Sequence, residues 1–377
     1  EEIAELRDLL NRLPAEERAV RVRCLDTIAT TYATAGDPGT AISFGEEALA
    51  VAAASDDWEL RCVPVTSLAL AHLELVELDK ARAYWADSID LDRSETGIHT
   101  GYFLQRLPLP LYFMGRAEEA AEVSRRAHTH CLAIHIRGET SIPPAAEALA
   151  CALQGDLARA HRCIAEAIDL VEESRYSGSA AFLFPAAAWL SSVSGDPDRA
   201  RECLGYVTEP GRLLDTREAL SPTLERCRTL VEAYAGNIAQ DSPVELSLPN
   251  TLFLQDIANL CLDVELFARG CNVPLHERTE EALAMAKARG AMFCGGWATF
   301  LPRIQAELAL LGGRHDDARR GYEGALGLAT RQGYALEVAR LELALGRLTE
   351  APDLVRRATE SFAEMGAHGL LVNSVRL

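Results

Sequence analysis

A group of histidines and one cysteine near residue 130 has the residue types and the spacing of a metal site. His128, Cys131 and His135 occupy positions i, i+3 and i+7, which an α-helix places on one face, and His130 is adjacent. Imidazole and thiolate are zinc ligands, and His161 is the obvious fourth ligand from another element. The alternative makes Cys131 a core residue and places the histidines on a solvated or inter-repeat face. We adopt the alternative, and therefore expect no metal and no cofactor.

Adjacent carboxylates could serve as general acid and base, but their positions favour a simpler interpretation. They lie near expected helix starts or beside Arg and Lys, where the helix dipole and solvation explain them. No GxSxG motif occurs, so no serine is placed as a nucleophile, and Ser177-Gly178-Ser179 is interpreted as a turn between repeats. We therefore predict no catalytic residues and no enzyme activity. The carboxylate pairs are Asp56-Asp57, Glu118-Glu119, Glu172-Glu173, Glu280-Glu281 and Asp316-Asp317.

The net charge of −19 over 377 residues excludes several partners. A protein that binds nucleic acid neutralises phosphates with clustered Lys and Arg, so this surface would repel DNA, RNA and anionic membranes. No run of 18 apolar residues is present that could cross a bilayer. The ten cysteines are scattered singly, which indicates small apolar core residues in a reducing compartment. With no signal peptide at Glu1, we expect a cytoplasmic chain or part of a longer one.

The elements that carry these residues repeat along the chain. The segments AGDPGTA, VELDKA, MGRAEEA, QGDLARA and SGDPDRA end at alanines that are 40, 39, 40 and 40 residues apart. A further match ends at Ala318, and the gap of 118 residues leaves room for two degenerate repeats, one near 222–235 and one over 252–289. A last repeat contains Ala339, Gly346 and Ala351. The alanines of the first five segments are Ala41, Ala81, Ala120, Ala160 and Ala200.

Small residues surround each turn at spacings of three, four and seven, which predicts two amphipathic helices that pack antiparallel. The turn glycine suits the left-handed conformation at the end of the first helix. Asp37, Asp156 and Asp196 then stand where an N-cap carboxylate accepts hydrogen bonds from the second helix. Pro38 and Pro197 suit the first turn of that helix. The predicted fold is all-α, a right-handed superhelix of stacked antiparallel helix pairs.

An interruption of the repeat pattern divides the chain into two parts. Residues 1–235 are expected to form a regular superhelix, with an N-terminal capping helix over residues 1–13. Segment 236–250 has two prolines and no helical apolar face, so it is interpreted as a loop or hinge. Residues 251–377 supply the remaining repeats. Stacking that continues across the segment is an equal alternative.

The small residues at these turns resemble the tetratricopeptide repeat, although a period of 40 exceeds the usual 34. Longer repeats of this kind resemble the helical arrays of large ATP-binding LuxR-type transcription activators, which include the maltose-regulon activator. The ending ATESFAEMGA, from Ala358 to Ala367, is similar to a closing helix of such arrays. The chain lacks a GxxxxGK[ST] phosphate loop and a helix-turn-helix after Leu377. The resemblance therefore implies the sensor and coupling region of a bacterial regulator.

Partners of stacked repeats usually dock on the concave wall, which the first helices form. The wall positions combine aromatic, polar and charged residues, which suits a protein, a peptide or a small amphiphilic ligand. The alternative is that the aromatic residues pack between helices. We expect a non-enzymatic binding region of a regulator, with a stand-alone peptide-binding adaptor as the second hypothesis and an all-helical enzyme as the third. The wall residues are Arg23, Asp26, Thr30, Thr66, Tyr102, Gln105, Tyr112, Phe182, Trp189, Phe300 and Arg303.

Overall fold

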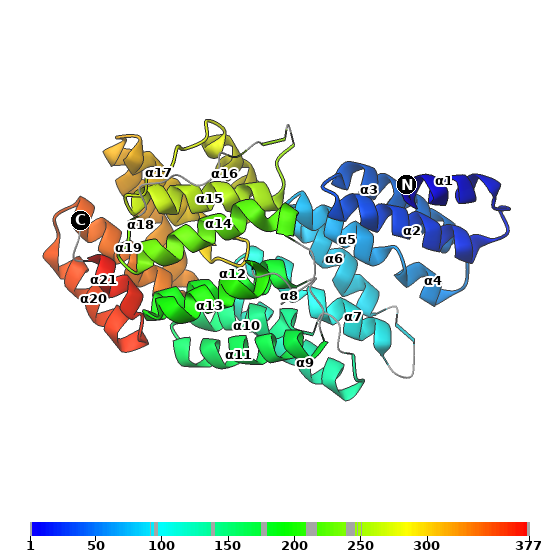
Figure 1. The fold of residues 1–377 in the computed structure, drawn as a ribbon, viewed down its shortest axis with the longest axis horizontal. Helices are drawn as coiled ribbons and strands as arrows, with labels where there is room; N and C mark the ends of the chain where they lie inside the picture. The colour runs from blue at the N-terminus through cyan, green and yellow to red at the C-terminus, as the bar shows by residue number, and fades with distance from the viewer. Residues whose placement is uncertain are drawn as a thin grey trace.

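A computed structural model describes residues 2–90, 92–93, 97–136, 140–174, 179–208, 217–238, 246, 248–249 and 251–374 of the chain (Figure 1). This part is all-helical apart from a small β-hairpin. None of its helices is both long and apolar enough to cross a membrane. The predicted hinge at 236–250 and the Ser177-Gly178 turn lie largely outside the described residues.

Thirteen helices follow one another through the N-terminal and central parts of the described chain (Figure 1). They are α1 (Glu2–Arg12), α2 (Arg18–Thr34), α3 (Pro38–Ala53), α4 (Trp58–Cys62), α5 (Val65–Glu74), α6 (Leu78–Ile89), α7 (Ile98–Arg106), α8 (Pro108–Phe113), α9 (Ala117–Ala133), α10 (Ile142–Leu153), α11 (Leu157–Ser174), α12 (Ala180–Ser194) and α13 (Pro197–Thr208).

The C-terminal part continues with helices on either side of the hairpin. They are α14 (Arg217–Tyr234), α15 (Leu254–Ala268), α16 (Thr279–Ala288), β1 (Phe293–Cys294), β2 (Thr299–Phe300), α17 (Leu301–Leu311), α18 (His315–Gln332), α19 (Ala335–Leu348), α20 (Pro352–Met365) and α21 (His368–Ser374).

The turns that the repeat pattern predicts separate helices that pack on each other, namely α2 with α3, α5 with α6, α10 with α11, α12 with α13, and α17 with α18. Gly36, Gly155 and Gly195 have the positive φ angles that the predicted left-handed turns require. The side chains of Asp156 and Asp196 accept hydrogen bonds from backbone N–H groups three residues later, as the N-cap prediction states. The alanine of each turn is fully buried, since a larger side chain would hold the helices apart.

Two elements differ from the sequence prediction. The first helix of the third repeat is split into α7 and α8, because Pro108 and Pro110 lack the backbone N–H groups that would continue the hydrogen bonding of α7. Phe300, predicted on a helix, instead lies in β2, where it pairs with Phe293 across the hairpin. The Gly295-Gly296 turn makes the hairpin possible, since Gly295 has a positive φ angle.

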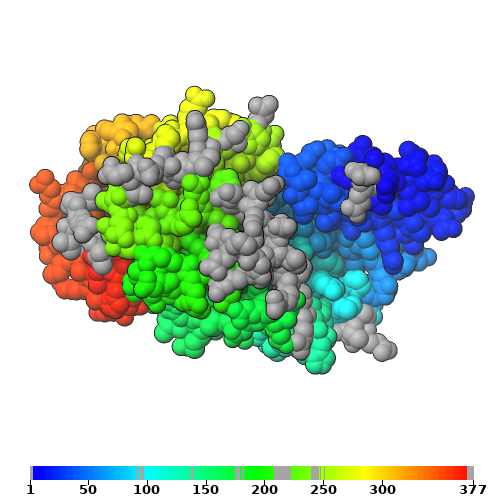
Figure 2. Space-filling model, viewed as in Figure 1, coloured from blue at the N-terminus to red at the C-terminus, as the bar shows by residue number. Residues whose placement is uncertain are grey.

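The C-terminal helices fold back onto the first helices of the central repeats. Helix α19 contacts α10, and α21 contacts α12 and α14 (Figure 1). The Met292 backbone N–H donates to the Phe113 carbonyl at 2.7 Å, and the Tyr334 hydroxyl donates to the Gly115 carbonyl. The N-terminal helices form a lobe that stands out from this central body (Figure 2). Helix α10 lies between α9, α11, α12 and α19 and is buried along its whole length.

Candidate ligand-binding sites

The predicted wall residues of the N-terminal repeats keep contact with solvent. On α2, Arg23 is exposed, while Asp26 and Thr30 are half-buried. Thr66 on α5 is also half-buried. Tyr102 on α7 is 48% exposed, and Ile98, one turn before it, is 41% exposed. These partly exposed positions on α2, α5 and α7, namely Arg23, Asp26, Thr30, Thr66 and Tyr102, are called the open wall below.

Asp26 is the most unusual group of the open wall. Burial raises the pKa of its carboxyl to about 6, although the nearby Ser67 hydroxyl lowers that pKa in part. The Oδ1 atom of Asp26 is buried and has no hydrogen-bond partner among the described residues. Burying a carboxylate without a cation or a full set of donors is costly. Asp26 is therefore a buried acceptor whose Oδ1 has no donor among the described residues.

The wall residues of the later repeats lie in a core instead. Gln105, Tyr112, Trp189 and Phe300 are each 0% exposed, and Phe182 is half-buried. They form no open surface, so for these side chains the packing alternative describes the structure. The C-terminal part contacts several of these helices, since β1 contacts α8, α19 contacts α10 and α21 contacts α12. Gln105 lies on α7, which packs on α9.

Aromatic rings pack together where the hairpin meets the central helices. The Tyr112 ring centroid lies 6.1 Å from that of Phe182 and 5.2 Å from that of Phe293. Phe293 in turn lies 5.4 Å from Phe300. Tyr112 and Phe300 thus meet at Phe293, which no sequence pattern indicated, and Phe182 contacts Tyr112. Edge and offset contacts at these distances add to the stabilisation from burial.

Arg303, predicted as a wall residue, lies in a buried network of charges. Its Nε donates to Glu337 at 2.9 Å, and its Nη2 lies 3.5 Å from Glu265. Arg340 approaches the same Glu265 at 2.8 Å. Burial acts to raise the pKa of Glu265, but Arg340, Arg303 and Arg269 outweigh it and hold that pKa well below its ordinary value. These charges have their partners inside the chain, so they serve the fold.

The histidines and the cysteine of the metal pattern turn to different partners. The Cys131 thiol is buried and lies 3.6 Å from the Gly101 carbonyl. His130 lies 2.9 Å from the Gly97 carbonyl, and His161 lies 2.7 Å from the Ser194 hydroxyl. Within the described residues, no group of three or more His, Cys, Asp or Glu side chains is arranged to hold a metal.

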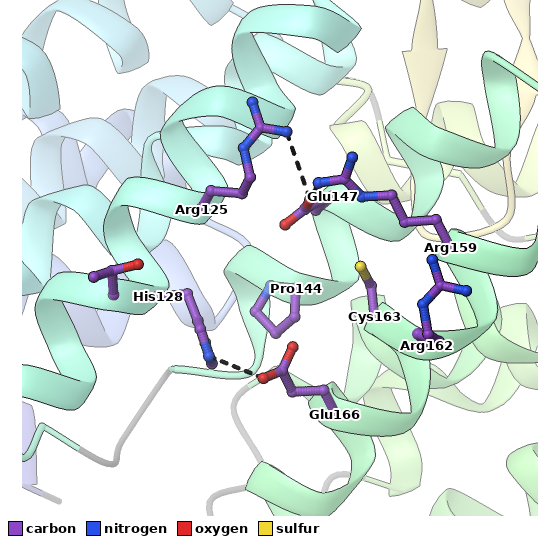
Figure 3. Close-up of a pocket in the computed structure, with 9 residues that line it drawn as sticks. Arg125, His128, Pro144, Glu147, Arg159, Arg162, Cys163 and Glu166 are labelled. Carbon is purple, nitrogen blue, oxygen red and sulfur yellow. Dashed lines mark hydrogen bonds and ion pairs between the residues drawn. The ribbon is translucent and has the colours of Figure 1, made fainter. Parts of the chain in front are cut away.

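A groove of about 470 Å³ lies between α9 and α11, with α10 as its floor (Figure 3). Helix α11 begins after the Asp156 cap and buries an apolar stripe that includes Ile164, which leaves its charged residues on the other face. This α9–α11 groove is lined by Arg125, His128, Thr129, Pro144, Glu147, Arg159, Arg162, Cys163 and Glu166.

The charges of the α9–α11 groove are only partly paired. Glu147, with a side chain 9% exposed, accepts a hydrogen bond from Arg159 at 2.5 Å and lies 3.9 Å from Arg125. His128 Nε2 lies 3.0 Å from Glu166, and His128 Nδ1 is buried without a partner among the described residues (Figure 3). Arg162 makes no hydrogen bond or ion pair within the described part.

The Cys163 thiol in the groove is not a nucleophile. Burial, assisted by the charge of Glu147, raises the pKa of Cys163 to about 12, so the thiol stays protonated near neutral pH. The arrangement therefore offers cationic donors around a neutral thiol and a proline ring.

Sequence reasoning did not identify Arg125, Arg159 and Arg162 as site residues. The available signal was local, since Arg125 and His128 stand in one basic segment and Arg159 to Arg162 in another, within a chain of net charge −19. What the sequence does not contain is the packing of α9 and α11 on either side of α10, which brings the two segments to one groove. No family model matches the chain, and no curated protein has detectable sequence similarity to it.

Proposed function

We propose that the chain is a non-enzymatic binding region built as a right-handed, tetratricopeptide-like superhelix. In this proposal its open wall holds a peptide, a protein segment or a small amphiphilic ligand. The region acts as the sensor and coupling part of a bacterial transcription or signalling regulator. A stand-alone peptide-binding adaptor is the second candidate, because the same open wall would serve it.

The observation that carries the proposal is the Asp26 carboxyl. It stands on the uncovered side of α2, is largely buried, and lacks a partner for Oδ1 among the described residues. Perturbed, buried titratable groups of this kind are candidates for binding or catalytic sites. A donor from a bound ligand, such as an amine or a backbone N–H, would satisfy this oxygen. In the proposal, Tyr102 and Ile98 on α7 supply exposed apolar surface to the same ligand.

Thiol chemistry receives no support from the core cysteines. Burial raises the pKa of Cys131 and of Cys151 to about 11, which keeps both thiols protonated. A binding role requires no activated group. This difference favours binding over the all-helical enzyme.

The proposal is tested with peptides selected from a random display library against the purified protein. Their affinity is then measured for the wild type and for Asp26→Asn and Tyr102→Ala. Loss of a hydrogen bond to a charged group weakens binding by tenfold or more, on the order of 1.5–3 kcal/mol. Phe267→Ala is the control, because this side chain is also exposed, at 40%, but lies on α15 outside the open wall.

The two substitutions have to weaken binding while the control leaves it intact. Peptides whose affinity is the same for all four proteins would remove the open wall as the binding site. Regulator and adaptor are distinguished by the gene around the chain. A phosphate-loop ATPase before it or a helix-turn-helix after it supports the regulator.

A further inference from the structure

We propose that the α9–α11 groove is a binding site for the oxyanion of a small organic molecule, a carboxylate or a phosphate, recognised by the guanidinium groups of Arg125, Arg159 and Arg162. The site lies between second helices of two neighbouring repeats. None of its lining residues belongs to the open wall, so it is a site separate from the one proposed above.

The charge balance of the groove favours an anion. Three guanidinium groups face two carboxylates, those of Glu147 and Glu166. Glu147 is held by Arg159 at 2.5 Å, and Glu166 is held by His128 at 3.0 Å. Arg162 is left with no ion pair among the described residues, and Arg125 reaches Glu147 only at 3.9 Å. Arg162 is therefore available for an incoming oxyanion, and Arg125 is held only by one long ion pair that an oxyanion could replace.

The chemistry of these cations narrows the ligand further. A guanidinium presents a planar fork of N–H donors that matches the two oxygens of a carboxylate or phosphate. Ordered waters alone would satisfy single donors but would not neutralise the charge. The bond between Arg159 and Glu147 fixes one wall of the groove, so the binding geometry is largely preformed (Figure 3).

The net charge of the whole chain does not prevent this. At physiological ionic strength, exposed charges farther away than about 8 Å are largely screened. An anion in the groove therefore senses mainly its own lining, which carries an excess of positive charge. The other acidic groups of the chain act weakly at that range.

The size and the remaining lining indicate a small organic ligand. The volume of about 470 Å³ falls in the range of roughly 300–1,000 Å³ that small-molecule pockets occupy. Pro144 and the protonated thiol of Cys163 offer apolar contact next to the cations. A molecule with an anionic head and a small apolar body fits both parts of the groove.

The experiment measures binding of phenyl phosphate and of benzoate by isothermal titration calorimetry at constant ionic strength. Benzamide is the uncharged probe with the same ring. We expect at least one anion to bind with a dissociation constant below about 1 mM, and benzamide not to bind. The anion that binds more tightly distinguishes a phosphate ligand from a carboxylate ligand.

Arg162→Ala should weaken that binding by tenfold or more, because it removes a charged donor that has no structural partner in the described part. The matched control is Arg126→Ala, which removes an exposed arginine from α9 that does not line the groove. Arg162→Lys keeps the charge but loses the fork, so an intermediate affinity is expected. The proposal is overturned if neither anion binds the wild type, or if Arg126→Ala weakens binding as much as Arg162→Ala.

Discussion

Helices α2 and α12 precede equivalent turns of their repeats, yet their surroundings differ. Residues of α2 such as Arg23 and Asp26 reach solvent or lie half-buried, whereas Trp189 of α12 is 0% exposed. The difference does not come from the turns, since Gly36 and Gly195 have nearly the same φ angle. The later helix has an additional neighbour, since α21 packs on α12, while α2 packs on α1, α3 and α5. Helices with the same turn pattern thus keep a partly exposed wall at one end and have a buried wall at the other.

The largest expected effect separates the open wall from the buried wall positions, called the covered wall below. The covered wall consists of Gln105, Tyr112, Trp189 and Phe300. Trp189→Ala should lower the free energy of unfolding by about 3–5 kcal/mol, because it leaves a large cavity in the core. Tyr102→Ala should change it by less than about 0.5 kcal/mol, because half of this side chain is already in water. Urea denaturation of both variants makes the comparison. Equal losses would contradict the distinction between the two regions.

A similar loss is expected from the buried charges beneath the covered wall. Glu265→Gln should cost about 3–5 kcal/mol at neutral pH, since it removes one of the two buried carboxylates, with Glu337, that Arg303 and Arg340 share. The pKa of Glu265 is depressed, so its stabilisation is complete above the ordinary value of 4.5 and is lost as the pH falls below it. Stability of the variant should fall less steeply than that of the wild type below pH 4.5. Parallel curves from pH-dependent urea denaturation would argue against this role.

A substitution at the contact between the hairpin and α12 should cause a smaller loss of stability. A methyl group at Gly296 would overlap the carbonyl oxygen of Phe182, so Gly296→Ala should cost about 2–3 kcal/mol. Gly324 in α18 has open space around its Cβ position, and Gly324→Ala should stabilise the protein by about 0.5–1 kcal/mol. Thermal denaturation of the two alanine variants tests the fold-back. A tolerated alanine at 296 would mean that the hairpin does not press against α12.

Asp26→Asn should raise the free energy of unfolding, by about 2 kcal/mol at pH 8. The raised pKa of Asp26 means that the folded state favours the protonated carboxyl, so wild-type stability declines as the pH rises through about 6. The neutral amide avoids that decline. Denaturation at pH 4 and pH 8 should show no gain at the lower pH and the full gain at the higher. A gain that is independent of pH would assign it to another cause.

The helices and the turns between neighbouring helices could be predicted from the sequence because their signals are local. Ala41, Ala160 and Ala200 are fully buried at the predicted turns, and the Asp156 and Asp196 caps form as expected. Each signal needs only neighbouring residues and the helical period. The same reasoning placed Arg23, Thr30 and Trp189 on one wall of the first helices, which stays a prediction. It carried no information on which of these helices another part of the chain would cover.

The missed features all depend on contacts between distant segments. The meeting of Tyr112 with Phe293 joins residues that are far apart in the sequence, and no period connects them. The α9–α11 groove similarly requires Arg125 and Arg162 to face each other over α10. Hydrophobic and charged residues at these positions fit solvent, a partner or the chain itself equally well by composition. Only the packed structure distinguishes the three.

Hydroxyl-radical footprinting read by mass spectrometry tests most directly whether the wall is open at one end and closed at the other. We expect Tyr102 to be oxidised rapidly in the folded protein. Tyr112 and Trp189 should be oxidised slowly until the protein is unfolded. The three rings are intrinsically reactive, so their rates report access by solvent. Rapid oxidation of Tyr112 and Trp189 in the folded protein would contradict the closure of the later repeats.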